Sequence, residues 1–432
     1  MRRLLYVAHR VPYPPDKGER VRAFHEIKAL SKDFHITLAA LTHRPADAQA
    51  AAPLRQWCRE ILLAPAGGTL GQARAGLSLL RGRSATEGYF HNPSLGRKIA
   101  DSAEREPFDL AFAYCTSVLP VCLDVPARAH VIDFVDADSS KWQAYAQDSP
   151  WPKSWLYRAE ARAVRKLEQL AIQRCQAVFI TSQTEIEMLG AQNPHIHAVG
   201  HGVDTDYFAP DANLPQPKAD DPSLVFTGQM DYRPNVDAVC WFVREVWPRL
   251  RRQATNLTFQ IVGRNPAKQV QRLEETPGVV VTGSVPDVRP YLSAASAAVV
   301  PLRIARGVQN KVLEAMAMAK PVIASTDALT GLNVQPGRDA LRADSPDEWI
   351  EHILSLTGPD GPSPELSQLA QRARKCVLEN YNRETCLQPM VDICKKLADD
   401  SAGATDKTAA SPTASRNATR PQHAPGEREA LL

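Results

Sequence analysis

The stretch VVPLRIARGVQNKVLEAMAMAKPVIA, residues 299–324, decides how this sequence is interpreted. It contains a short apolar strand that ends at Pro301, an arginine-containing loop, a helix that begins near residues 308–309, and a second apolar strand at 321–324. Neither strand alternates apolar with polar residues, which is typical of strands buried on both faces of a parallel sheet. The stretch therefore predicts one strand–helix–strand unit of a doubly wound α/β fold.

The loop and the helix start within this stretch carry an anion-binding pattern. Arg306, Gly307 and Lys311 surround the free backbone amides with which the helix begins, and such a helix N-terminus attracts phosphate groups. Glu314 follows one to two turns into the helix, where its carboxylate could accept hydrogen bonds from the vicinal hydroxyls of a ribose. The alternative is that Glu314 pairs with Lys311 or Arg306 on the helix surface. We predict a pyrophosphate site at this turn.

Similar apolar runs divide the rest of the chain into two α/β blocks, each long enough for its own parallel sheet. The runs of the first block are 4–8, 36–41, 110–114, 130–134 and 177–181, and those of the second are 223–227, 257–262, 279–282, 297–301 and 321–324.

The segment between the blocks is rich in proline and aspartate, which is typical of a linker. After residue 398 the chain has almost no apolar residues, so it cannot offset the entropy of ordering. The expected parts are a first domain at 1–202, a linker at 203–222, a second domain at 223–380, a helix at 381–398 and a disordered tail at 399–432.

Other strand-to-helix turns carry residues suited to a nucleotide. Gly18 follows the first strand and would let a ligand approach the backbone beside a helix start. Gly228 ends the first strand of the second block, and Arg233 beyond it could clamp a diphosphate. Gly263 and Gly283 end the next two strands, where a base or ribose could lie across the backbone. For each turn the alternative is structural: a proline-rich loop, a simple turn, or a helix capped by the residue at 235.

Two segments of the chain resemble glycosyltransferase family 4, the large group of retaining enzymes with the GT-B fold. The first is Lys311-Val-Leu-Glu-Ala-Met-Ala with the following Lys320-Pro-Val-Ile-Ala, and the second is His201-Gly-Val-Asp-Thr-Asp-Tyr-Phe208. The order of the strand-end glycines also matches, and the likeness covers most of 1–398. Asp133-Phe-Val-Asp-Ala-Asp-Ser-Ser-Lys-Trp142 is similar to the sugar transferases associated with exopolysaccharide and PEP-CTERM systems.

This resemblance implies two Rossmann-like domains that face each other across an interdomain cleft. The first domain would bind the acceptor, the second would bind the nucleotide sugar, and the helix at 381–398 would cross back to the first domain. The implied reaction moves a hexose-type sugar from a nucleotide-diphosphate sugar to a glycan or lipid-linked acceptor with retention, in exopolysaccharide or cell-surface glycan synthesis. No metal and no other cofactor is expected.

The resemblance also assigns roles to particular residues. The family uses two glutamates separated by seven residues, and Glu314 matches the second, which binds the ribose. Arg306 occupies the position of the first, a departure that puts recognition of the transferred sugar in question and leaves Arg306 as a catalytic candidate that could bind the diphosphate or a charged sugar. Gly307 and Lys311 would help bind the donor. Asp133 and Asp136 lie near a position where the family often has a histidine, so they are candidates for orienting the acceptor hydroxyl or the donor sugar.

Composition and motifs exclude several other classes of protein. The net charge of +3 does not favour a nucleic-acid-binding protein. The eight cysteines are scattered, which indicates reduced thiols and a cytoplasmic protein without a structural zinc site. No apolar run is long enough to span a membrane. Neither G-x-G-x-x-G nor G-x-S-x-G occurs, which argues against a dinucleotide-binding dehydrogenase and an α/β hydrolase.

Three alternatives remain open at this point. Asp136-Ala-Asp138 also fits the D-x-D pattern of metal-dependent GT-A transferases. The arginine at 306 also allows a non-catalytic GT-B-fold protein that binds only glycans or nucleotides. The basic segment 151–174 could rest on an anionic membrane at its inner face, or it could be a solvated surface of the first domain.

Overall fold

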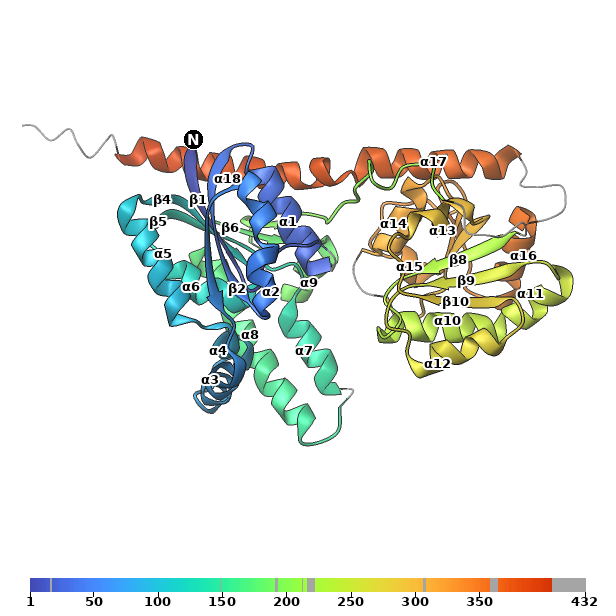
Figure 1. Cartoon of the computed structure of the whole chain (residues 1–432), viewed down its shortest axis with the longest axis horizontal. Helices are drawn as coiled ribbons and strands as arrows, with labels where there is room; N and C mark the ends of the chain where they lie inside the picture. The colour runs from blue at the N-terminus through green and yellow to red at the C-terminus, as the bar shows by residue number, and fades with distance from the viewer. Residues whose placement is uncertain are drawn as a thin grey trace, which may run out of the picture.

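The computed structural model describes residues 1–15, 18–147, 149–190, 193–211, 213–215, 222–305, 308–357 and 364–405. These residues form two α/β domains that lie side by side, and two C-terminal helices run along one side of both domains (Figure 1). Arg306, Gly307, parts of the predicted linker and residues 406–432 lie outside the described residues.

Within the described residues, the sheet of domain 1 has seven parallel strands in the order β3-β2-β1-β4-β5-β6-β7. Because the chain moves from β1 to β2 and β3 on one side and from β4 onward on the other, the topological switch point lies between β1 and β4. The strands are β1 (Arg2–Ala8), β2 (Phe34–Thr42), β3 (Cys58–Pro65), β4 (Phe108–Tyr114), β5 (Ala127–Asp133), β6 (Ala177–Ile180) and β7 (Ile196–Ala198).

Helices cover both faces of this sheet. They are α1 (Gly18–Leu30), α2 (Pro45–Ala50), α3 (Gly68–Leu80), α4 (Ala85–Phe90), α5 (Pro93–Arg105), α6 (Leu119–Leu123), α7 (Asp138–Gln147), α8 (Lys153–Arg174) and α9 (Gln183–Leu189), with short 3-10 turns at Ala52–Gln56 and Thr116–Val118. The last helix of the chain, α18 (Arg383–Thr405), packs on the same face as α1, where Leu387, Met390 and Cys394 join the core of domain 1.

The central strand β1 shows why the apolar runs form strands. Leu4, Tyr6 and Ala8 face the core shared with α1 and α18, while Leu5 and Val7 face the core on the opposite side. Since alternate residues of a strand point to opposite faces, a strand with helices on both sides requires an unbroken apolar run.

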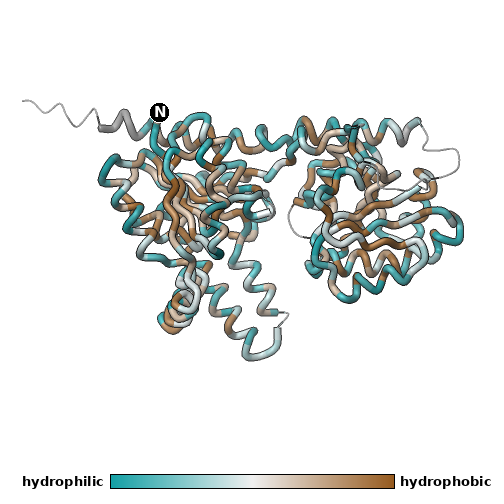
Figure 2. Tube along the Cα trace, in the orientation of Figure 1, coloured by the Kyte–Doolittle hydropathy of each residue, from teal (hydrophilic) through white to brown (hydrophobic). Residues whose placement is uncertain are grey.

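Domain 2 repeats the arrangement, with six described parallel strands in the order β10-β9-β8-β11-β12-β13 and a switch point between β8 and β11. Its strands are β8 (Ser223–Thr227), β9 (Thr258–Val262), β10 (Val279–Gly283), β11 (Ala297–Val300), β12 (Val322–Ala324) and β13 (Leu341–Arg342). Its helices are α10 (Arg233–Glu245), α11 (Trp247–Gln253), α12 (Lys268–Gln271), α13 (Arg289–Ala294), α14 (Asn310–Ala317), α15 (Thr326–Leu329), α16 (Pro346–Thr357) and α17 (Pro364–Asn380), with a 3-10 turn at Arg272–Glu275. Figure 2 shows the hydrophobic strands inside each domain.

The two chain passages that join the domains are hydrogen-bonded to each other. The backbone amide of Val203 donates to the Tyr381 carbonyl at 2.7 Å, and the amide of Arg383 donates to the Val203 carbonyl at 3.0 Å. Gly202 has a φ of +60°, and a Cβ at this position would lie 2.5 Å from the Arg383 Cα. Only glycine fits here, because the two passages pack so closely. These passages, at residues 202–203 and 381–383, are called the hinge below.

All ten strands expected from the sequence are present, and the two doubly wound parallel sheets confirm the predicted fold class. Three strands were missed, and each lies at the edge of a sheet: β3, β7 and β13. Helix α18 continues to Thr405, beyond the expected end at residue 398. No helix in the described part of the chain combines the length and the apolar content needed to cross a bilayer.

Candidate functional site

The switch point of domain 2 lies where β8 and β11 run next to each other, because the chain leaves the two strands in opposite directions. Ligands of open α/β sheets bind beyond the carboxyl ends of the strands at such a point. Gly228 follows β8, and the loop after β11 leads into α14, which carries Lys311 and Glu314. The fold therefore brings the two most informative turns of the sequence to one edge of the sheet.

Three strand-end glycines line this edge as adjacent turns. The Gly228 amide donates to the Val262 carbonyl at 3.0 Å, and the Gly263 amide donates to the Gly283 carbonyl at 3.2 Å. A Cβ on Gly263 would lie 1.6 Å from the Gly228 carbonyl oxygen, so no side chain fits between the two turns. Gly283 has a φ of +67°, which favours glycine for a different reason. The result is a surface of bare backbone that a ligand can approach closely.

Lys311 points from the first turn of α14 toward the turn after β8. Its Nζ donates to Oδ1 of Asn235 and lies 4.1 Å from the centre of the Phe226 ring. A Cβ on Gly228 would lie 3.1 Å from this Nζ. Burial lowers the pKa of Lys311 to about 7, although Glu314 opposes this shift. The amine is therefore held next to the glycine turn. A bound anion there would raise the pKa of Lys311 and favour its protonated form.

Asn235 holds Lys311 in this position. Its side chain is buried, and its Nδ2 donates to the Gln229 carbonyl at 2.9 Å while its Oδ1 accepts from Lys311. The cap residue of α10 is Tyr232, so the alternative of Asn235 as the helix cap is wrong. Asn235 lies in the first turn of α10, where it connects the turn after β8 to α14.

Glu314 lies half-buried on α14, one turn beyond Lys311. Burial raises the pKa of its carboxyl group, while Lys311 and Arg383 act in the opposite direction. Lys311 makes its hydrogen bond to Asn235, not to Glu314, which leaves the carboxylate oxygens able to accept hydrogen bonds from a ligand. The ribose-binding role of Glu314 stays a prediction, because the other partner considered for it, Arg306, lies outside the described residues.

The remaining predicted donor residues have less defined surroundings. Arg233 is exposed at the first position of α10, close in sequence to the Gly228 turn. Arg306 and Gly307 lie outside the described residues, so their predicted roles stay predictions. Arg303 of the same loop forms a bidentate ion pair with Asp237, at 2.6 and 3.0 Å, and thereby fixes the loop to α10.

In domain 1, Asp133 is fully buried at the end of β5. Its carboxylate accepts from Arg22 Nε at 2.6 Å and from the Val135 amide at 2.7 Å, and Arg22 also pairs with Glu26 at 2.8 Å. Burial would raise the pKa of Asp133, but Arg22 and the hydrogen bonds hold it below its usual value. Asp133 therefore lies beneath the sheet edge, in an ion pair that joins β5 to α1.

Asp136 is exposed in the short loop between β5 and α7. The intervening Val135 has a φ of +68°, and Cys115 at the end of the neighbouring β4 has a φ of +76°. A left-handed backbone is costly for a β-branched residue and is concentrated at functional sites. Asp138 accepts a hydrogen bond from the Thr116 hydroxyl at 3.2 Å, which joins the segment after β4 to the start of α7.

The sequence interpretation singled out Gly18 at this edge of domain 1 but missed His9. His9 follows β1, stacks on the Tyr114 ring with centroids 6.1 Å apart, and lies 3.7 Å from the Glu19 carboxylate. Gly18 begins α1 in the same region, is exposed, and would have nothing within 4 Å of an added Cβ. The signal for His9 was its place directly after the first strand, at a switch point.

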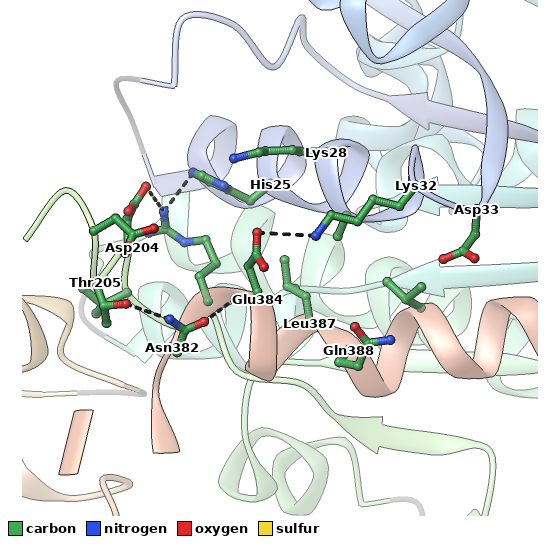
Figure 3. Close-up of a pocket in the computed structure, with 15 residues that line it drawn as sticks. His25, Lys28, Lys32, Asp33, Asp204, Thr205, Asn382, Glu384, Leu387 and Gln388 are labelled. Atoms are coloured by element: carbon green, nitrogen blue, oxygen red, sulfur yellow. Dashed lines mark hydrogen bonds and ion pairs between the residues drawn. The ribbon is translucent and has the colours of Figure 1, made fainter. Parts of the chain in front are cut away.

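A groove of about 660 Å³, open to solvent, lies behind the hinge between α1, residues 203–206 and α18 (Figure 3). Arg383 lines this groove, and its Nη1 donates to His25 Nε2 at 2.8 Å and lies 3.6 Å from the Asp204 carboxylate. Arg383 also acts electrostatically on Glu314. No sequence motif pointed to Arg383, which joins α1 of domain 1 to the hinge through His25 and Asp204.

Comparison with known proteins agrees with this arrangement. Residues 221–358 match the family described as Glycosyl transferases group 1. Among solved structures, sucrose-phosphate synthase of Thermosynechococcus elongatus aligns with a TM-score of 0.67 at 17% identity, over 93% of this chain and 100% of that one. Anabaena HepE in complex with UDP and glucose aligns with a TM-score of 0.62 at 15% identity, over 92% of this chain and 100% of that one. The chain has the GT-B fold of glycosyltransferases.

A variant of S. aureus TarM, in complex with fondaparinux, alpha-GlcNAc-glycerol and UDP, has a similar GT-B fold, with a TM-score of 0.60 at 11% identity over 91% of this chain and 100% of that one. No curated protein sequence matches the chain. The two sheets exclude the GT-A interpretation of Asp136 and Asp138, because the GT-B fold divides its ligands between two such domains. In the described residues no three His, Cys, Asp or Glu side chains are grouped as metal ligands, and independence from metal stays a prediction.

Proposed function

We propose that this GT-B protein is a retaining glycosyltransferase of family 4, which moves a hexose-type sugar from a nucleotide-diphosphate sugar without a metal ion. The observation that carries the proposal is the edge of domain 2, where bare glycine backbone, the amino group of Lys311 and the carboxylate of Glu314 meet at the switch point. The same residues belong to the segment that matches group 1 glycosyl transferases.

The proposed chemistry follows from the charges at this edge. A nucleotide diphosphate leaves the sugar as an anion, so groups that stabilise the developing negative charge lower the barrier. The N-terminus of α14 and the Lys311 ammonium would provide this stabilisation, with Arg306 as a further proposed contributor. The approaching phosphates would raise the pKa of Lys311 from about 7 and keep it protonated. Glu314 would accept hydrogen bonds from the ribose hydroxyls.

Domain 1 would bind the acceptor at the switch point between β1 and β4. We propose that Asp136 and His9 face the acceptor hydroxyl, and that Asp133 acts indirectly by fixing the end of β5 to α1. The acceptor is proposed to be a lipid-linked or polysaccharide-precursor glycan in cytoplasmic exopolysaccharide synthesis of the PEP-CTERM-associated kind. The UDP and sugar ligands named for HepE and TarM support a nucleotide-sugar donor.

A thermal-shift screen with UDP-, GDP-, ADP- and dTDP-sugars tests the proposal, because a ligand that binds only the folded state raises the melting temperature. We expect one base to stabilise the wild type. The Glu314→Ala variant should bind the same nucleotide more weakly by about 1–3 kcal/mol, as expected for the loss of charge-assisted hydrogen bonds. Glu351→Ala, on the exposed surface of α16, is the matched control. If no nucleotide shifts the melting temperature, the proposal is wrong.

A non-catalytic protein that binds nucleotides or glycans is the second candidate, because Arg306 replaces the first glutamate of the family pattern. The two candidates differ in turnover and not in binding. Hydrolysis or transfer of the sugar from the best-binding nucleotide sugar, measured with and without EDTA, separates them. Turnover that survives EDTA supports the metal-independent enzyme, whereas binding without any turnover supports the second candidate.

A further inference from the structure

Helix α3 presents an apolar stripe to solvent. Leu70, Leu77 and Leu80 are 73%, 46% and 87% exposed, and together with the exposed Ala73 they recur at helical spacing on one side of the helix. Of the residues of α3, Gly71 alone is buried. A helix that packs on a core shows the opposite pattern, with its apolar side inward. Figure 2 shows this hydrophobic helix outside the core of domain 1.

The start of α8 carries a second set of exposed apolar side chains. Trp151 and Trp155 are 82% and 61% exposed, and Leu156 is also exposed. Aromatic contacts hold the hairpin of α7 and α8 together: the Trp142 and Tyr157 rings lie at 41° to each other, with centroids 5.5 Å apart. The exposed tryptophans are therefore held on a packed helical hairpin.

A buried carboxylate joins the two apolar regions. Glu160 of α8 accepts hydrogen bonds from the Ser84 hydroxyl at 2.6 Å and from the amides of Ala85 and Thr86 at 2.7 and 3.0 Å. These donors form the start of α4, which follows α3 in a tight hairpin. The hairpins α3–α4 and α7–α8 thus form one unit, and both project from the same end of domain 1 (Figure 1).

The charges around these side chains are almost all positive. Residues 61–86 contain no acid, and the sequence there carries Arg74, Arg81 and Arg83, of which Arg83 pairs with Glu87 of α4 at 2.5 Å. Residues 149–166 contain one acid, Glu160, whose carboxylate is already used by α4. Exposed tryptophan and leucine next to arginine and lysine are typical of surfaces that lie in the interface of an anionic bilayer. A second copy of the chain would instead bring like charges together.

We propose that this docking face, made by Leu70, Leu77, Leu80, Trp151 and Trp155, seats domain 1 on an anionic lipid bilayer. The proposal deepens the proposed function, since a lipid-linked acceptor would be presented to domain 1 at that surface. The link to the acceptor rests on the proposed function, whereas membrane binding itself does not. The apolar side chains would enter the acyl boundary, and Arg81, Lys153 and Arg158 would contact lipid phosphates.

Co-sedimentation of the full chain with phosphatidylcholine vesicles that contain phosphatidylglycerol tests the docking face. We expect binding that weakens as salt is added and that is lost on pure phosphatidylcholine. The Leu77→Glu variant should bind about tenfold more weakly, because a partly buried leucine is lost and an anion is introduced. Leu378→Glu in α17 introduces the same change at a similarly exposed leucine, 42%, on the other side of the molecule, and should bind like the wild type.

The charge contribution has its own variant. Arg81→Ser combined with Lys153→Ser should weaken vesicle binding by about fivefold for each charge removed. Any of three results overturns the proposal: no binding of the wild type to anionic vesicles, equal loss in Leu77→Glu and Leu378→Glu, or a dimer in sedimentation velocity that Leu77→Glu dissociates. Thermal shifts with nucleotide sugars on the same variants separate the two proposals. Donor binding without vesicle binding would reject only the docking face, and vesicle binding without donor binding would reject only the proposed function.

Discussion

The carboxyl edges of the two sheets occupy equivalent places in the fold but differ in the residues that form them. The edge of domain 2 is bare backbone, with Gly228, Gly263 and Gly283 in adjacent turns and one lysine held beside them. The edge of domain 1 rests on a buried ion pair between Arg22 and Asp133 and carries left-handed residues that are not glycine. The edge of domain 2 leaves backbone groups and a lysine available to a ligand, whereas the charged side chains Arg22 and Asp133 at the edge of domain 1 pair with each other.

This difference suggests what each edge is built to bind. A nucleotide diphosphate is the same in every catalytic cycle, and close backbone approach with a few cations suits it. An acceptor hydroxyl needs one correctly placed group on a rigid support, which a buried ion pair can provide. The four predictions below test that contrast, from the largest expected effect to the smallest.

The largest effect is expected from breaking the ion pair of domain 1. Asp133→Ala would leave Arg22 buried with an incomplete set of partners, which costs about 3–5 kcal/mol of unfolding free energy. Asp136→Ala, in the exposed loop after the same strand, should change stability by less than about 0.5 kcal/mol but reduce turnover by about 100-fold if Asp136 handles the acceptor proton. Urea unfolding and sugar transfer measure the two effects. A stable Asp133→Ala protein without turnover would make Asp133 the catalytic group.

Gly263→Ala should damage the edge of domain 2. Its Cβ would fall 1.6 Å from the Gly228 carbonyl oxygen, so both turns must move, at a cost of about 2–4 kcal/mol. Gly18→Ala is the matched substitution in domain 1, where the Cβ has open space and stability should not fall. Thermal unfolding and nucleotide titration measure both variants. Unchanged nucleotide affinity in Gly263→Ala would contradict the donor site proposed here.

The pH dependence of donor binding should report on Lys311. In the free protein its pKa is lowered to about 7, mainly by burial, and a bound diphosphate would raise it. Binding then takes up a proton above pH 7, so affinity should be constant below that pH and fall by at most about tenfold per pH unit above it. Calorimetry with a nucleotide sugar in buffers of different ionisation enthalpy measures the uptake. Lys311→Met should bind more weakly and show no such slope, and a slope that persists would exclude this lysine.

The smallest effect concerns the histidines at the hinge. Burial and the neighbouring Arg383 lower the pKa of His25 to about 4, and burial with Arg22 lowers that of His201 to about 3. An unfolded chain protonates histidine below about pH 6.5, so the stability from these neutral histidines is present above that pH and is lost as the pH falls toward 4. Each should contribute about 1 kcal/mol per pH unit in this range. His25→Gln should flatten the slope in urea unfolding, and an unchanged slope would argue against a neutral His25.

The sequence predicted every interior strand of the two described sheets and the edge strand β10, and missed the other three edge strands. β1 from Leu4 to Ala8 and the whole of β11 are unbroken apolar runs, because both strands are buried on both of their faces. β3 contains Arg59 and Glu60 and is only partly buried, while β7 and β13 are three and two residues long. An edge strand has one neighbouring strand fewer and less buried surface, so its sequence can lack the apolar run on which the prediction depends.

The candidate site was predictable where it depends on local sequence. Strand-end glycines and the start of α14 could be located from the chain alone, because turns and helix starts are set by neighbouring residues. The contact of Lys311 with Asn235 joins residues 76 positions apart, and that of Arg22 with Asp133 joins residues 111 apart. Such pairs arise only from the folded arrangement. The exposed stripe of α3 was missed because apolar residues at helical spacing normally indicate a core.

The place of α18 has a consequence for how the chain matures. The ribosome synthesises α18 after all of domain 2, yet its Leu387, Met390 and Cys394 complete the core of domain 1. The domain that is synthesised first is therefore the last to become complete, and it must wait, with one face of its sheet partly uncovered, until nearly four hundred residues have been translated. During that interval the nascent protein offers an apolar surface for chaperones to protect.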